Sequence, residues 1–234
     1  MAVTRPSGAR ARPLNVAREA QPARRTRTRA IARALDRAYP DARCELDFRD
    51  AWQLLVATIL SAQCTDKMVN QVTPGLFAAY PTPDALAAAP ADAVEALVKR
   101  TGFFRQKTKS IQAVARTVSQ THGGAVPDDM EALTRLPGVG RKTANVVLGT
   151  AFDRPAIFVD THVTRLSNRL GLTLEDDPVK IERDLQQLLP PRVWTGFAHR
   201  LIHHGRRVCA ARKPRCSGCA LRRWCPQIGV TNAV

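Results

Sequence analysis

One lysine in this chain stands where a cation is poorly tolerated. The stretch LPGVGRKTANVV (136–147) places Gly138 and Gly140 just before a run of helical character, and the helix is expected to begin near Arg141. Lys142 then lies in the first turn, where the positive end of the helix and the neighbouring Arg141 both destabilise an ammonium group. This placement favours the neutral amine, which is a usable nucleophile. From this segment alone, an exposed lysine that contacts a phosphate group is an equally good interpretation.

A carboxylate follows eighteen residues after this lysine. Asp160 closes the apolar run AIFVD and precedes a predicted helix with apolar residues along one face. A carboxylate at a fixed position can take a proton from a nearby lysine or stabilise positive charge on a sugar. It is also a good N-cap for the helix. The sequence by itself does not place Asp160 beside Lys142.

Four cysteines crowd together with the spacing C-x6-C-x2-C-x5-C. Thiolates at such short intervals can surround one metal centre, and the spacing fits both a Cys₄ zinc site and a [4Fe–4S] cluster. Because no apolar signal segment precedes them, a reducing compartment is expected rather than a secreted disulfide protein. The cysteines are Cys209, Cys216, Cys219 and Cys225, and the cations between them are Arg212, Lys213, Arg215, Arg222 and Arg223. These cations fit contact with a phosphate backbone, a solvated basic face being the alternative.

The glycine stretch also predicts an anion site made of backbone amides. If helices flank a tight turn at Gly138–Gly140, the amides of the turn and of the first helical residues lack internal partners. Such amides bind phosphate without reading sequence. We therefore expect a helix–hairpin–helix at 130–149, with Gly138, Val139, Gly140 and Arg141 as DNA contacts. A plain turn between two helices is the alternative.

The composition indicates a protein that meets a polyanion. The chain has 234 residues, a net charge of +16 and a sequence pI near 10.7. A protein this basic usually binds nucleic acid, although a merely solubilising surface is possible. No uncharged apolar run approaches the roughly 18 residues that a membrane span requires.

The elements that must position these residues are helical. The run 50–63, DAWQLLVATILSAQ, is apolar nearly all round and predicts a buried central helix capped by Asp50. PAIFV (155–159) is the only short β-like run, so the chain is expected to be all-α. Residues 1–29 contain eight arginines and one acid and predict a disordered basic arm, with a dispensable tail as the alternative.

Together these motifs resemble one family. LPGVGRKTANVVL, then VDTHV, then the four cysteines, in that order, resemble the endonuclease III family of the helix–hairpin–helix DNA glycosylases. The likeness also includes LSAQCTD (60–66) and HGRRVCAARKPRC (204–216), and it extends from about residue 30 to residue 226.

The resemblance implies a two-domain fold with DNA in the cleft between the domains. A six-helix barrel would span 45–154, and an iron–sulfur cluster domain would combine 30–44 with 155–234. Lys142 would be the nucleophile, Asp160 the essential aspartate facing it, and the four cysteines the ligands of a [4Fe–4S] cluster. Lys213 and Arg215 of the cysteine segment are expected DNA contacts.

The resemblance also implies a way to open the duplex. Gln63 would fill the gap left by a flipped base, a helix-end amide bonded to backbone being its alternative role. Phe103 and Phe104 depart from the family pattern, which often has an aliphatic residue in this second wedge loop. A bulkier aromatic wedge can still unstack bases.

The implied activity is base excision repair. The expected enzyme removes oxidised pyrimidines from double-stranded DNA through a lysine Schiff base and cleaves abasic sites on the 3′ side by β-elimination. It would act as a monomer in a bacterial cytoplasm, associated with the nucleoid. The rivals are an adenine glycosylase acting opposite oxidised guanine, which typically lacks this lysine, and a non-catalytic metal-loop DNA-binding protein.

Overall fold

The computed structural model describes residues 19–234, and within this range every regular element is a helix. The 155–159 run is extended and largely buried, but it forms no strand in this part of the chain. The all-α prediction is therefore confirmed. None of the helices described is both long and apolar enough to cross a membrane. The helices are α1 Gln21–Ala38, α2 Ala51–Leu60, α3 Asp66–Ala79, α4 Pro83–Ala88, α5 Ala91–Val98, η2 Lys99–Thr101, α6 Phe104–His122, α7 Met130–Arg135, α8 Arg141–Ala151, α9 Thr161–Arg169, α10 Pro178–Leu188, η3 Pro191–Val193, α11 Trp194–Arg207 and η4 Arg222–Trp224.

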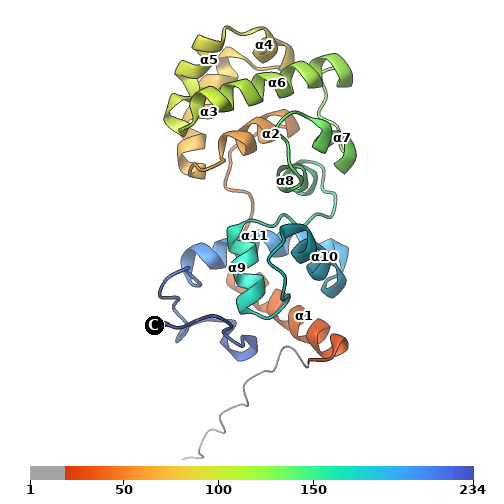
Figure 1. Cartoon of the computed structure of the whole chain (residues 1–234), viewed down its shortest axis with the longest axis vertical. Helices are drawn as coiled ribbons and strands as arrows, with labels where there is room; N and C mark the ends of the chain where they lie inside the picture. Colours follow the sequence, from red (N-terminus) through yellow and green to blue (C-terminus); the bar gives the residue numbers. More distant parts are fainter. Residues whose placement is uncertain (1–18) are drawn as a thin grey trace, which may run out of the picture.

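The helices form two lobes (Figure 1). The first lobe contains α2 to α8, and the second contains α1, α9 to α11 and the C-terminal segment. The chain leaves the second lobe after α1 and returns to it after α8. The segment 45–154, described throughout, is divided more finely than the expected six helices, because Pro90 separates the short α4 from α5.

Helix α2 forms the centre of the first lobe. Its residues Leu54–Leu60 are all buried, as the apolar run predicts. Asp50 caps its start, with Oδ1 accepting a hydrogen bond from the backbone N–H of Gln53 at 2.8 Å. A helix that is apolar all round must be covered on every side, and α2 packs against α3, α6 and α8.

The two lobes approach closely where α8 meets the start of α11. A Cβ atom on Gly149 would lie 2.7 Å from Oγ1 of Thr195, so only glycine fits at this point of α8. The Thr195 hydroxyl in turn donates to the carbonyl oxygen of Ala156 at 3.2 Å. The contact joins α8 of the first lobe to α11 and to the extended segment before α9.

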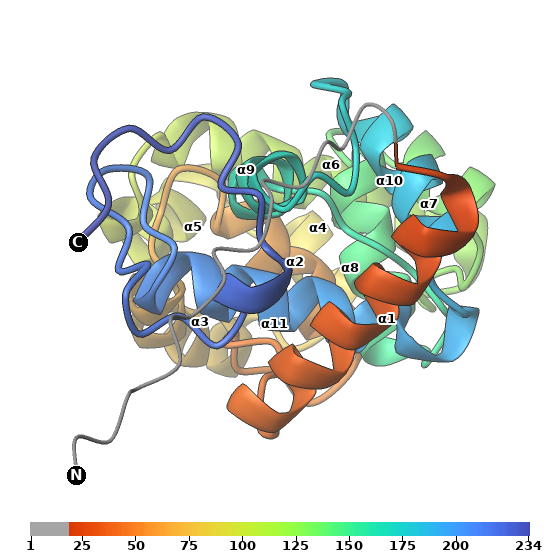
Figure 2. The same ribbon diagram turned by 90° about the horizontal axis from the view of Figure 1, so that it is seen from below.

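The predicted disordered arm is wrong in its extent. Residues 1–18 lie outside the described range, but 21–29 belong to α1, which packs against α10, α11 and η4 (Figure 2). Arg27 is buried and donates to Glu19 at 2.9 and 2.7 Å and to the carbonyl oxygen of Leu170 at 2.6 Å. The prediction of a disordered arm missed this anchoring arginine.

Candidate active site, DNA-facing loops and cysteine centre

A pocket of about 80 Å³ lies where the two lobes meet. Its walls come from the linker before α2, from α2, the start of α3, α8, the segment before α9, and α11. We refer to it as the interlobe pocket. It is lined by Arg43, Cys44, Glu45, Leu46, Thr58, Ser61, Asp66, Lys142, Val146, Phe158, Asp160, His199, Ile202, His203 and Arg206.

Lys142 and Asp160 both line this pocket. Lys142 is in the first turn of α8, and Asp160 is the N-cap of α9. Oδ1 of Asp160 accepts a hydrogen bond from the backbone N–H of Val163 at 2.8 Å. Asp160 is thus both a helix cap and a wall of the pocket, so the two interpretations of this residue are compatible.

The surroundings of Lys142 differ in one respect from those expected. Arg141 was expected to add a positive charge beside the lysine, but its guanidinium is paired with the buried carboxylate of Glu182. Nε and Nη2 of Arg141 donate to Glu182 at 2.7 and 2.8 Å. These hydrogen bonds raise the pKa of Arg141 further above its usual range. Of the two causes expected from the sequence, the N-terminus of α8 therefore remains the one without a compensating partner.

The pocket also contains a charged group that sequence reasoning missed. Arg206 of α11 donates to Glu45 of the linker and, at 2.9 Å, to Asp66 at the start of α3. This arginine ties the second lobe to the first at the edge of the pocket. Asp66 and Arg206 both lie in stretches that resemble the family, but nothing in their spacing shows that they meet.

In the hairpin loop, residues 136–140, only one of the two glycines has a positive φ. Gly138 has a φ of +75°, whereas Gly140, at φ −87°, is extended and caps α8 without any side-chain hydrogen bond. Val139 is buried and its amide donates to the carbonyl oxygen of Leu136 at 3.1 Å. Among the described residues, the amides of Gly140 and Arg141 have no acceptor, which leaves them available to an anion.

A second hollow, of about 270 Å³, is bordered by Gln63, Phe103 and Gly138. Gln63 and Phe103 have φ values of +51° and +47°, which is unusual for side chains of their size. Phe103 is 68% exposed, and the side chain of Gln63 makes no hydrogen bond within the described part of the chain. The expected alternative role of Gln63, an amide bonded to backbone, is therefore not what the structure contains. Phe104 instead packs against the core at the start of α6.

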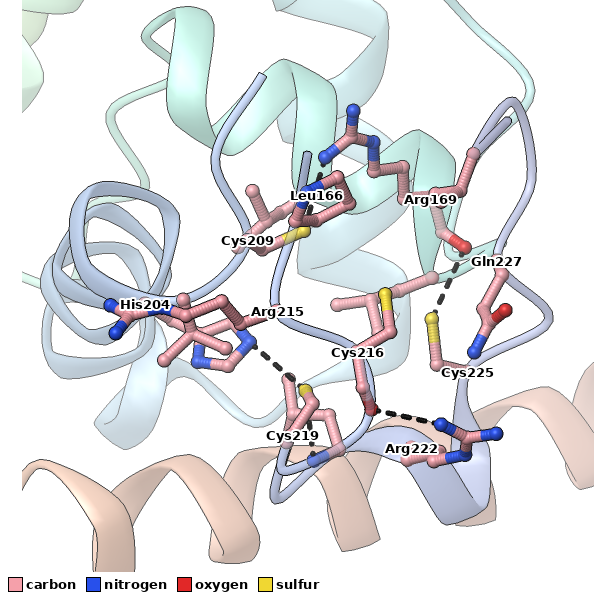
Figure 3. Close-up of a pocket in the computed structure, with 15 residues that line it drawn as sticks. Leu166, Arg169, His204, Cys209, Arg215, Cys216, Cys219, Arg222, Cys225 and Gln227 are labelled. Carbon is pink, nitrogen blue, oxygen red and sulfur yellow. Dashed lines mark hydrogen bonds between the residues drawn. The ribbon is translucent and has the colours of Figure 1, made fainter. Parts of the chain in front are cut away.

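The four clustered cysteines line one hollow in the second lobe (Figure 3). All four are free thiols. In the described part of the chain, no three His, Cys, Asp or Glu side chains converge tightly enough to hold one metal ion.

The surroundings of these cysteines are polar and specific. Nη1 of Arg169 donates to Sγ of Cys209 at 3.3 Å, and Nε2 of His204 lies 3.4 Å from Sγ of Cys219 (Figure 3). Tyr39 of α1 is 2.9 Å from the other ring nitrogen of His204. Burial raises the pKa of Cys225 to about 11, so its thiolate requires a compensating positive charge.

The cations between the cysteines differ in availability. Lys213 is exposed, with a φ of +50°. Arg215 is exposed but its guanidinium donates to the carbonyl oxygen of Arg207, and Arg222 donates to that of Cys216 at 3.2 Å. The loop therefore uses some of its arginines to hold its own backbone.

The two lobes of helices described, with a short hairpin loop between α7 and α8, define a helix–hairpin–helix protein. A family model described as "HhH-GPD superfamily base excision DNA repair protein" matches residues 56–191, and the chain belongs to this superfamily.

Known proteins are similar to this chain in sequence and in structure over most of its length. Endonuclease III of Synechocystis sp. is 53% identical over 204 residues, which cover 87% of this chain and 93% of the relative. The solved structure of a non-covalent Endonuclease III–DNA complex has a TM-score of 0.82 and 42% identity, covering 86% of this chain and 94% of that one. A trapped Endonuclease III–DNA covalent intermediate has the same TM-score and identity, with 86% and 95% covered.

Proposed function

We propose that this chain is a base excision repair DNA glycosylase with abasic-site lyase activity, acting on oxidised pyrimidines in double-stranded DNA. The observation that carries the proposal is that Lys142 and Asp160 line one pocket between the lobes. The relative that forms a covalent intermediate with DNA supports the same chemistry, since it is 42% identical to this chain.

In the proposed reaction, the neutral amine of Lys142 attacks the anomeric carbon of a flipped nucleotide, and the damaged base departs with the electrons of the glycosidic bond. Asp160 has one oxygen committed to the cap of α9, and its other oxygen serves as the proton acceptor or stabilises the cationic sugar. The departing base takes up a proton and the attacking nitrogen loses one. The lone pair of this nitrogen then breaks the bond between the anomeric carbon and the ring oxygen, which takes up a proton, and the Schiff base forms. The Schiff base acidifies the adjacent carbon, and the electrons left by the loss of its proton expel the 3′ phosphate.

We assign the DNA contacts to four segments. Amides of the hairpin loop, at Gly138, Gly140 and Arg141, hold a phosphate, and the buried Val139 keeps the loop in shape. Gln63 enters the gap left by the flipped base, with Phe103 as the second wedge. Two cations of the cysteine segment, Lys213 and Arg215, contact the backbone.

We further propose that Cys209, Cys216, Cys219 and Cys225 hold a [4Fe–4S] cluster. Four cysteine side chains around one hollow fit a cluster that is held by four thiolates. Bound there, the cluster would cross-link the loop that carries the cations. The domain boundaries proposed are 45–154 for the barrel and, because α1 begins at Gln21, 21–44 with 155–234 for the cluster domain. The protein is proposed to be a monomer that works in the bacterial cytoplasm on nucleoid DNA.

The decisive variant is Lys142→Gln. We expect it to abolish base release and strand cleavage on duplexes with thymine glycol or an abasic site, while binding to undamaged duplex survives. Borohydride should trap wild-type protein covalently on the damaged strand and fail to trap the variant. Lys180→Gln, which removes the same charge from an ion pair with Glu175 on the surface of α10, is the control. Strand cleavage retained by pure Lys142→Gln would refute the proposal.

A third duplex separates the rival enzyme from the proposed one. Adenine placed opposite oxidised guanine should not be released. Its release without strand cleavage would identify the adenine glycosylase, and binding without any reaction on all three duplexes would identify a DNA-binding protein.

A further inference from the structure

A buried carboxylate lies outside the interlobe pocket but is tied to α8. Glu182 of α10 is 4% exposed. Its two oxygens accept four hydrogen bonds: two from Arg141, one from Nδ2 of Asn145 at 3.1 Å, and one from Nε2 of Gln186 at 3.1 Å. The carboxylate is thus held by side chains of α8 and α10, one helix from each lobe.

The network extends to the segment that carries Asp160. Nδ2 of Asn145 has two hydrogens, and the second bond goes to the carbonyl oxygen of Ile157 at 3.0 Å. Asn145 lies about one helical turn after Lys142. Ile157 lies three residues before Asp160. A single chain of hydrogen bonds therefore runs from α10 through α8 to the backbone that leads to Asp160.

A contribution to the stability of the fold is a poor explanation for this buried network of Glu182, Arg141 and Asn145. A buried ion pair is often no more stabilising than apolar side chains of the same volume, because both charges must be removed from water. The network instead fixes the orientation of α8, since the bidentate Arg141 and the amide of Asn145 prevent this helix from rotating against its neighbours. Rotation matters here, because displacements of about 1 Å can cost catalysis about 100-fold.

We infer that Glu182 is a positioning residue, which through Arg141 and Asn145 holds Lys142 in register with Asp160. This inference rests on the proposed function, in which those two residues react together. Glu182 itself touches neither DNA nor the reacting atoms. Its role is to keep the first turn of α8 and the segment 156–160 at one fixed separation.

The test is single-turnover base release and borohydride trapping with excess enzyme. In Glu182→Gln, which keeps the size and removes the charge, the rate constant should fall by about 10- to 100-fold. The reactive fraction of the enzyme and its affinity for undamaged duplex should stay within about twofold of wild type. A merely structural role would lower the reactive fraction and leave the rate constant of the folded molecules unchanged.

The matched control is Glu19→Gln. Glu19 also binds an arginine, Arg27, through both oxygens, but at the start of α1 and outside the interlobe pocket. The rate constant of Glu19→Gln should equal that of wild type. Equal losses in the two variants, or a rate constant for Glu182→Gln within about twofold of wild type, would overturn the inference.

A second variant decides the matter if Glu182→Gln does not fold. Asn145→Ala removes the link to Ile157 while the pair of Glu182 with Arg141 remains, and its rate constant should fall in the same way. Where both single variants fold, the double variant should lose no more than the more affected single one, because both act through one chain of bonds. Multiplied losses, or a normal rate constant in Asn145→Ala, contradict the inference. If wild type neither traps nor cleaves, the proposed function fails instead.

Discussion

Oδ1 of Asp160 accepts the backbone N–H of Val163 at 2.8 Å, so the residue that faces the interlobe pocket is also the one that starts α9. The cap occupies one oxygen and fixes the carboxylate on a rigid element. The second oxygen is the one that the proposed chemistry uses. The two roles can be separated because they need different properties: the cap needs an acceptor, and the chemistry needs a charge.

Asp160→Asn should therefore keep the fold and lose the reaction. Asparagine and aspartate are nearly equal N-caps, so the free energy of unfolding should change by less than about 0.5 kcal/mol. Base release should fall by about 100-fold or more, because the amide accepts no proton. Asp177→Asn, at the N-cap of α10, is the control and should leave both quantities unchanged. Normal base release by Asp160→Asn would reduce Asp160 to a helix cap.

The hairpin loop should respond differently to one substitution made at its two glycines. Gly138→Ser places a side chain at φ +75°, which should cost about 1–2 kcal/mol of stability. Gly140→Ser should be neutral or slightly stabilising, because φ is −87° there and serine is a better N-cap than glycine by a few tenths of a kcal/mol. Denaturant unfolding of both variants measures the difference. Equal costs would mean that the turn does not depend on the left-handed conformation.

These two glycines also show how far the hairpin could be predicted from the sequence. The motif predicted the turn, its place before α8 and the unpaired amides, because each follows from local backbone chemistry. It did not separate the positive φ of Gly138 from the extended Gly140, because both conformations are open to glycine.

Contacts between segments far apart in the chain were harder to predict from the sequence. The pairing of Arg141 with Glu182 joins residues 41 positions apart, and the burial of Arg27 depends on a carbonyl 143 positions away. A charged residue has the same local pattern whether it is solvated or anchored. The sequence therefore predicted which residues could react, while only the packing of the lobes placed Lys142 and Asp160 in one pocket.

The exposed Phe103 should be dispensable for folding and needed for activity. Its φ of +47° is strained for phenylalanine, and little of its side chain is buried. Phe103→Asn, which tolerates this conformation, should unfold with the same free energy as wild type or up to about 1 kcal/mol more. Base release from a damaged duplex should decrease. Phe104→Asn is the contrasting variant and should be destabilised, because Phe104 packs against the core. Unimpaired base release by Phe103→Asn would remove it as a wedge.

His199 should make the protein sensitive to mild acid. Burial first, and then electrostatic repulsion from neighbouring basic groups, Arg200 among them, lower the pKa of His199 from 6.5 to about 4. Between these values the unfolded chain binds more protons than the folded one, so stability is lost as the pH falls from the higher value to the lower. From about pH 7.5 to about pH 5 the loss from this group is about 2 kcal/mol.

The comparison that isolates this effect is with His199→Leu. The variant has no proton to gain, so the difference in unfolding free energy between it and wild type should shift by about 2 kcal/mol over that range, in favour of the variant at low pH. A constant difference would show that His199 is not buried in its neutral form.

The four clustered cysteines should be required as a set. With a [4Fe–4S] cluster, purified protein should be coloured and contain about four iron atoms per chain. Cys225→Ser should lose both the colour and the iron, because an alcohol ionises far less readily than a thiol and does not replace a thiolate ligand. The site is already unfavourable for an anion, since burial raises the pKa of Cys225 to about 11. The loop 209–225 should then become sensitive to proteases, since the five cations between its cysteines are all exposed. Cys64→Ser, which alters a thiol outside the hollow, should keep the iron and the colour. One zinc atom per colourless chain would instead assign the centre to the alternative that the cysteine spacing left open.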